Sequence, residues 1–168
     1  MYRDVLRMAG ALALLTLTGL AQAQVSVSDP WVRGTVGGQK ASGAFMTVNT
    51  QEKLTLVGAD SDVTAHTEVH EMRMVGDVMR MRRVEAVPLA PDAPLELKPG
   101  GYHIMLLDLD KPLEPGQSVH LKLHFERADG GRLSLPVVAP VLALTASMGS
   151  GKQEHQGHGD AHRMHKSN

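Results

Sequence analysis

The strongest constraint on the fold is an alternation of apolar and polar residues at positions 118–125. Apolar side chains occupy every second place there, namely Val119, Leu121, Leu123 and Phe125. Successive side chains of a strand point to opposite faces, so this pattern predicts a strand with one face in the core and one in water. No segment shows the 3.6-residue apolar repeat of a long helix. We therefore expect an all-β protein.

Turn signals divide the rest of the chain into short segments. The clearest breaks are Pro99-Gly100-Gly101 and Asp129-Gly130-Gly131. Seven or more short strands at this spacing predict an antiparallel β-sandwich or barrel. The predicted strands lie at 25–33 (one or two strands), 43–49, 53–59, 67–84 (two strands), 95–97, 102–109, 118–125 and 132–138.

The first 23 residues have the pattern of a secretory signal peptide. Arg3 and Arg7 precede an apolar run at 8–21, and an A-x-A motif ends at Ala23, where we expect cleavage. The run is shorter than the roughly 20 residues needed to span a bilayer. No cysteine follows the cleavage site to carry a lipid. We predict export without a membrane anchor, and a folded domain at 24–146.

The last segment, 147–168, differs in composition. It is rich in glycine, histidine and lysine and nearly free of branched apolar residues. Such a segment buries too little surface to offset its ordering entropy, so we predict a disordered tail. Its interrupted imidazoles and thioethers are a candidate second metal site, which would take Cu(II) or Zn(II): Met148, His155, His158, His162, Met164 and His165.

The complete absence of cysteine excludes several classes of function. Disulfide stabilisation, thiol redox chemistry, iron–sulfur clusters, cysteine zinc sites and blue-copper sites all need thiols. A net charge of −1 argues against a nucleic-acid or membrane-surface partner. No catalytic triad, G-x-S-x-G turn, phosphate loop or paired-carboxylate motif is recognisable, so we expect a binding protein and not an enzyme.

Five of the ten methionines fall at positions 70–105. If Gly76-Asp77 forms a two-residue hairpin turn, Met74 lies opposite Met79 and Met72 lies opposite Met81. Cross-strand partners share a face, so these methionines and His70 form one stripe. A Met-padded core is the alternative explanation, but a histidine at the end of the stripe counts against it.

A second histidine–methionine pair follows at His103 and Met105. Two residues apart on a strand, they share a face, while Ile104 points the other way. Thioether sulfur is a poor ligand for zinc, calcium or magnesium and a good one for Cu(I). Two imidazoles with thioethers and no thiolate therefore favour Cu(I).

The spacing of His70, Met81, His103 and Met105 resembles that of the periplasmic copper chaperones of the PCu(A)C family. The phrases V-H-E-M at 69–72, D-V-M-R-M-R at 77–82 and L-K-P-G-G-Y-H-I-M-L at 97–106 are similar to that family as well, as are W-V-R at 31–33 and the turn at Asn49. The resemblance covers roughly positions 25–138.

The resemblance implies a cupredoxin-like Greek-key β-sandwich. It also implies one Cu(I) bound by His70, Met81, His103 and Met105. The implied function is carriage of copper toward the CuA centre of cytochrome c oxidase, alone or with a Sco-type thiol protein. We expect a monomer. Met72 is a candidate neighbour of the site, whereas Met74 and Met79 are expected to serve packing.

Three alternatives remain open at this stage. The first is general copper storage or tolerance. The second is a copper redox protein, although the motif lacks a thiolate or a third imidazole. The third is a structural sandwich without metal, which uses its Met face for protein contact.

Overall fold

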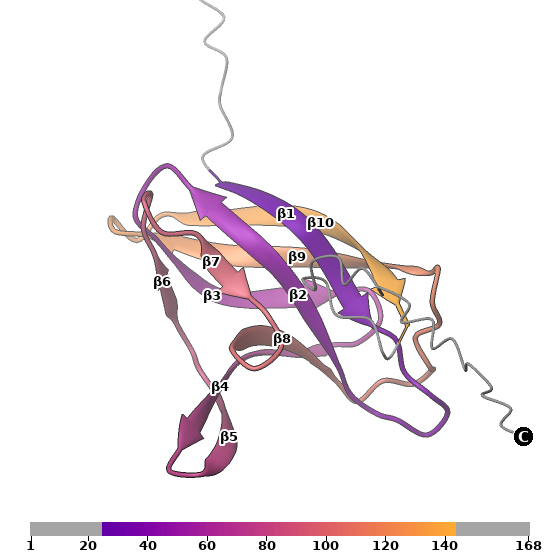
Figure 1. Ribbon diagram of the computed structural model, residues 1–168. Helices are drawn as coiled ribbons and strands as arrows, with labels where there is room; N and C mark the ends of the chain where they lie inside the picture. Colours follow the sequence, from indigo (N-terminus) through magenta and orange to yellow (C-terminus); the bar gives the residue numbers. More distant parts are fainter. Residues whose placement is uncertain (1–24, 144–168) are drawn as a thin grey trace, which may run out of the picture.

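The computed structural model describes residues 25–143, which form ten strands (Figure 1). The strands are β1 (Val25–Arg33), β2 (Ser42–Thr50), β3 (Leu54–Ser61), β4 (His66–Val75), β5 (Val78–Arg83), β6 (Val87–Leu89), β7 (Leu95–Leu97), β8 (Tyr102–Leu107), β9 (Ser118–Arg127) and β10 (Arg132–Leu142). The part of the chain described holds no helix capable of crossing a bilayer. The predicted signal peptide and tail lie outside these residues.

The strands are arranged as a β-sandwich, as predicted. Their hydrogen-bonded order is β5-β4-β8-β7-β2-β1-β10-β9-β3-β6. Strand β10 joins the two layers because it pairs with β9 along its length and with the end of β1. All pairings between strands are antiparallel except β1–β10 and β7–β8, which are short and parallel. Figure 1 shows β1 and β2 in one layer and β3 and β9 in the other.

The core lies between these layers and follows the predicted alternation. Val119, Leu121, Leu123 and Phe125 of β9 are all buried, while His120 on the other face is exposed. Burying one such side chain contributes about 1.5–3 kcal/mol. This alternation fixes which face of β9 turns inward.

Strand β6 was not predicted, and several strand ends differ from the predicted bounds, most of all those of β8 and β10. Strand β8 stops at Leu107 because Asp108 adopts a positive φ of 51°. Strand β10 continues to Leu142, past Pro140, because Ala139 and Val141 are buried in the core. Burial there outweighs the loss of one ladder donor at the proline.

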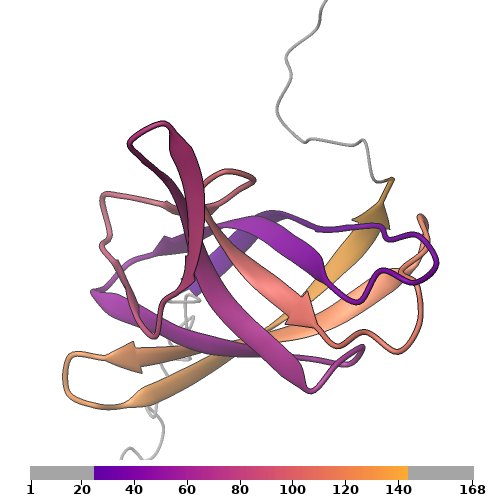
Figure 2. The ribbon, with the colours of Figure 1, turned by 90° about the horizontal axis from the view of Figure 1, so that it is seen from below.

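The β4–β5 hairpin projects from the body of the sandwich (Figures 1 and 2). Gly76 takes the positive φ that the turn requires, and Met72 pairs with Met81 as predicted, followed by Met74 with Met79. The expectation that Met74 and Met79 serve packing was wrong: they are 58% and 47% exposed. Strand β4 pairs with β8 only as far as Glu71, so the outer hairpin has no neighbouring strand to cover it.

Candidate metal site

His70 and His103 lie directly opposite each other across β4 and β8. Their ring centroids are 6.0 Å apart. Their chain neighbours Val69 and Ile104 point into the core, so both imidazoles lie on the outer face of the same layer. His103 is nevertheless only 5% exposed. The site is thus a sheltered position on an outer face.

The Gly101 carbonyl holds the site together from the β7–β8 turn. It accepts a hydrogen bond from the Met72 amide at 3.0 Å and lies 3.0 Å from Nδ1 of His103. A carbonyl can only accept, so Nδ1 carries the proton and Nε2 keeps its lone pair. A backbone carbonyl on one ring nitrogen is a common way to orient a metal-binding histidine.

Glu68 plays the corresponding part for His70. Its Oε2 lies 2.7 Å from Nε2 of His70, and its Oε1 accepts from Arg83 at 3.1 Å. The hydrogen bond from His70 and the charge of Arg83 lower the pKa of Glu68, which stays ionised. A carboxylate accepts, so Nε2 is the protonated nitrogen. Nδ1 of His70 is then a lone-pair donor, and it is buried without a hydrogen-bond partner.

A pocket of about 450 Å³ lies beside these rings and is lined by methionine side chains. Met72, Met81, His103 and Met105 all line it. His70 lies at its side and is not part of the lining. The structure therefore brings three of the four predicted ligands, and the predicted neighbour Met72, to one cavity, with the fourth opposite His103.

The Phe45 ring forms the floor of this pocket. Phe45 lies 6.2 Å from His103 and 4.4 Å from Trp31 between ring centroids, and Arg33 covers the Phe45 ring. The ring can fold back over β2 because residue 43 is glycine: a Cβ there would lie 2.7 Å from Cζ of Phe45. The floor excludes water from one side of the site.

The donor atoms fit a soft ion better than a hard one. Within residues 25–143 no three histidine, cysteine, aspartate or glutamate side chains are grouped to hold a metal. The donors on this face are instead two imidazole nitrogens with free lone pairs and, beside them, the thioether sulfurs that line the pocket. That set matches Cu(I) and not zinc, calcium or magnesium.

Burial is the main cause of a lowered pKa at His103, with Arg33 and His70 lowering it further and the Gly101 hydrogen bond acting against them. The ordinary pKa of a histidine is 6.5. When the pH falls below this value, His103 is protonated in the unfolded chain but stays neutral in the folded protein, because burial disfavours the charged ring. The free energy of unfolding is therefore expected to fall as pH drops below 6.5. Urea titrations from pH 7.5 to 5 should show a shallower fall for His103→Asn, and equal slopes would contradict the assignment.

The other candidates lie elsewhere. His120 and His124 sit on the outer face of β9, where His124 contacts Asp60 and Ser134. His66 pairs with Asp108 on the surface. The predicted tail site, from Met148 to His165, lies outside the described residues.

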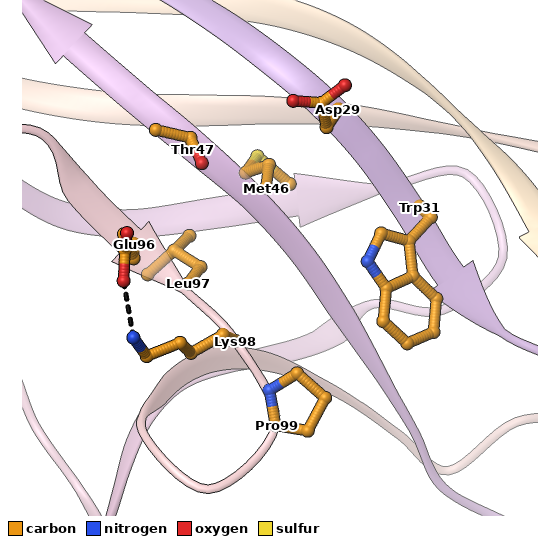
Figure 3. Close-up of a pocket in the computed structure, with 8 residues that line it drawn as sticks. All are labelled: Asp29, Trp31, Met46, Thr47, Glu96, Leu97, Lys98 and Pro99. Carbon is orange, nitrogen blue, oxygen red and sulfur yellow. Dashed lines mark hydrogen bonds and ion pairs between the residues drawn. The ribbon is translucent and has the colours of Figure 1, made fainter. Parts of the chain in front are cut away.

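A larger hollow of about 600 Å³ lies on the other side of Pro99 (Figure 3). Trp31 lines it, and an ion pair between Glu96 and Lys98 crosses its edge. The two charges of this ion pair neutralise each other, and the residues that line the hollow include no histidine. The smaller pocket therefore remains the candidate metal site.

Sequence reasoning missed Glu68 and the Gly101 carbonyl. Glu68 was predictable from the two-residue period of a strand, because it precedes His70 by two residues and so lies on the same face. The carbonyl had no sequence signal, because its role depends on how the β7–β8 turn meets β4.

The fold and the site together define a β-sandwich protein with a soft-metal donor set on one outer face. The chain belongs to the family described as "Putative lipoprotein LpqE-like", whose model matches residues 25–137. It is 32% identical over 118 residues to "Putative lipoprotein Lxx21020" of Leifsonia xyli subsp. xyli, covering 70% of this chain and 69% of that protein. It is also 30% identical over 112 residues to "Uncharacterized protein RP573" of Rickettsia prowazekii, covering 63% and 62%.

Solved structures share the fold. A copper-bound PCuAC domain from PmoF2 superposes with a TM-score of 0.55 at 23% identity, covering 72% of this chain and 94% of that domain. Its apo form gives a TM-score of 0.57 at 23% identity, covering 74% and 94%. Apo-DR1885 from Deinococcus radiodurans gives 0.52 at 22% identity, covering 80% and 90%. At these identities the comparison supports the fold alone.

Proposed function

We propose that this protein is a periplasmic copper chaperone that binds one Cu(I) through His70, Met81, His103 and Met105. The observation that carries the proposal is the pairing of His70 with His103 beside a Met-lined pocket. Each ring has one nitrogen turned to a fixed acceptor and the other left with its lone pair. The copper-bound PmoF2 domain, which shares the fold, supports the choice of metal.

The donor set suits carriage and release. All four ligands are neutral, so the bound ion keeps its single positive charge and no proton has to leave on binding. Met81 is 47% exposed, which gives an acceptor direct access to one ligand. A thiol-bearing acceptor offers a softer, charged donor and can displace thioethers one at a time. The protein is then a carrier and not a catalyst.

The acceptor that fits this chemistry is the CuA centre of cytochrome c oxidase, reached directly or through a Sco-type thiol protein. We place the protein in the periplasm, exported by its first 23 residues. The lipoprotein names of its relatives also agree with export. Since this chain contains no cysteine, we propose the form without a lipid anchor. The tail, with its histidines and methionines at 148–165, is proposed as a second copper site.

Copper stoichiometry tests the proposal directly. The secreted protein and a version ending at Ala146 are loaded with Cu(I) anaerobically, and bound copper is measured by mass spectrometry and electron paramagnetic resonance. We expect each form to bind one Cu(I), which gives no electron paramagnetic resonance signal, and the longer form to bind additional copper. Absence of bound copper in the shorter, folded form would refute the chaperone. Copper that stays bound when a thiol acceptor is added would favour storage instead.

Glu68→Gln is expected to lower Cu(I) affinity by about 10–100-fold, the usual range for residues that orient a ligand histidine. The amide removes the charge that fixes the proton on Nε2 of His70. Competition with a chromophoric Cu(I) chelator measures the effect. Glu71→Gln is the matched control, because it breaks an ion pair with Arg82 on the opposite face of the same strand. Equal affinities of the two variants would show that Glu68 does not position His70.

A further inference from the structure

A second methionine pair lies beyond the proposed site. Met74 and Met79 oppose each other two residue pairs further out than Met72 and Met81, with Arg73 and Arg80 between them on the other face. Partners and next-but-one residues share a face, so the four methionines form two sulfur pairs in line from the pocket to the hairpin tip.

The outer pair is not explained by packing or by strand preference. Met74 and Met79 are 58% and 47% exposed. Branched and aromatic side chains are the ones enriched in strands, and methionine is not among them. Two exposed thioethers in register therefore need another explanation, and their sulfur is what sets them apart from valine or threonine.

The spacing allows an ion to pass between the pairs. Successive pairs on one face are separated by two strand residues, or about 7 Å. Methionine has three rotatable bonds and adapts its shape readily. A sulfur of each pair can thus reach toward the next without movement of the backbone.

We infer that Met74 and Met79 form an outer, weaker Cu(I) site that loads the inner one. The inference rests on the proposed function. In the transfer, bonds from copper to the sulfurs of Met74 and Met79 break as bonds to the inner ligands form, first to Met81 and then to Met105, His70 and His103. The metal remains Cu(I), and no proton or electron moves, because all four ligands are neutral.

The surrounding charge fits a site of short residence. Arg73 and Arg80 oppose each other on the reverse face of the hairpin and make no ion pair within residues 25–143. From His70 to Arg83 the hairpin carries four arginines, at 73, 80, 82 and 83, against two carboxylates, Glu71 and Asp77, so its net charge is positive. A cation is therefore bound weakly by Met74 and Met79, whereas the inner site adds two imidazole ligands and binds it more tightly.

Methionine methyl NMR tests the assignment on the full secreted chain. With ¹³C-methyl methionine and Ag(I) as a redox-inert probe, the first equivalent should shift Met81 and Met105. Excess Ag(I) should then shift Met74 and Met79. If the first set moves and the second does not, the outer site is refuted while the proposed function stands. If the first set does not move, the proposed function itself fails.

Loading kinetics provide the second measurement. Met74→Leu with Met79→Leu is expected to slow Cu(I) uptake from a chelate by about tenfold, equivalent to ~1.4 kcal/mol in the barrier. The final copper content and affinity should not change. Val75→Leu with Val78→Leu alters the neighbouring pair on the reverse face and is the matched control. Equal uptake rates in the two double variants would overturn the inference.

Discussion

Replacing His103 with asparagine and Met105 with leucine is expected to abolish tight Cu(I) binding and to leave the fold intact. The two side chains lie on the outer face of β8, while Ile104 and Leu106 hold the strand in the core. Asparagine can still donate to the Gly101 carbonyl, and leucine has a volume close to that of methionine. The loss should exceed the about 10–100-fold typical of residues that only orient a ligand.

Anaerobic competition with a Cu(I) chelator measures this affinity, and circular dichroism checks the fold. The matched control is His120→Asn with His124→Asn, which removes two histidines from the outer face of β9. The control should bind copper like the natural protein. Undiminished affinity in the His103 and Met105 variant would show that the metal site lies elsewhere in the chain.

Ile104→Ala is expected to lower the free energy of unfolding by about 2–5 kcal/mol, because it leaves a cavity in the core. Ile104 is completely buried and lies between the two ligands of β8. This residue therefore connects the core to the metal site. A ligand that binds only the folded state stabilises it by RT ln(1 + [L]/Kd), so Cu(I) should restore part of the loss.

Urea unfolding with and without Cu(I) gives both quantities. Ile104→Val keeps most of the side chain and should cost only about 0.5–1.5 kcal/mol. Cu(I) should raise the free energy of unfolding of Ile104→Ala but not that of the His103→Asn, Met105→Leu variant, which has lost the site. An equal increase in the two proteins would contradict the connection between Ile104 and the metal site. If Ile104→Ala lowered the free energy of unfolding by less than Ile104→Val does, Ile104 would not fill the core as the structure shows.

The register of the hairpin was predictable from local sequence. A two-residue turn at Gly76-Asp77 leaves one pairing that places methionine opposite methionine, and the structure has that pairing. The inward face of β9 was predictable for the same reason, because a strand has a side-chain period of two. The exposure of Met74 was not predictable, since it depends on β8 beginning at Tyr102, opposite Glu71, so that no strand pairs with the outer part of β4.

The direct opposition of His70 and His103 was likewise undetermined by spacing alone. A separation of 33 positions fits many registers between β4 and β8, and a slip of one residue would put the rings on opposite faces. The structure fixes this register through the buried neighbours Val69 and Ile104, which pair with each other in the core.

By itself the sequence determined the all-β class, the hairpin with its Met stripe, and a donor set of imidazoles and thioethers without thiols. These follow from periodicity, turn residues and composition, which act over a few positions. Only the tertiary structure decided that His103 is buried, that Glu68 and the Gly101 carbonyl orient the two rings, and that Met74 and Met79 stand in solvent. Those features arise where β4, β8 and the β7–β8 turn meet, because contacts between distant segments depend on how whole strands pack.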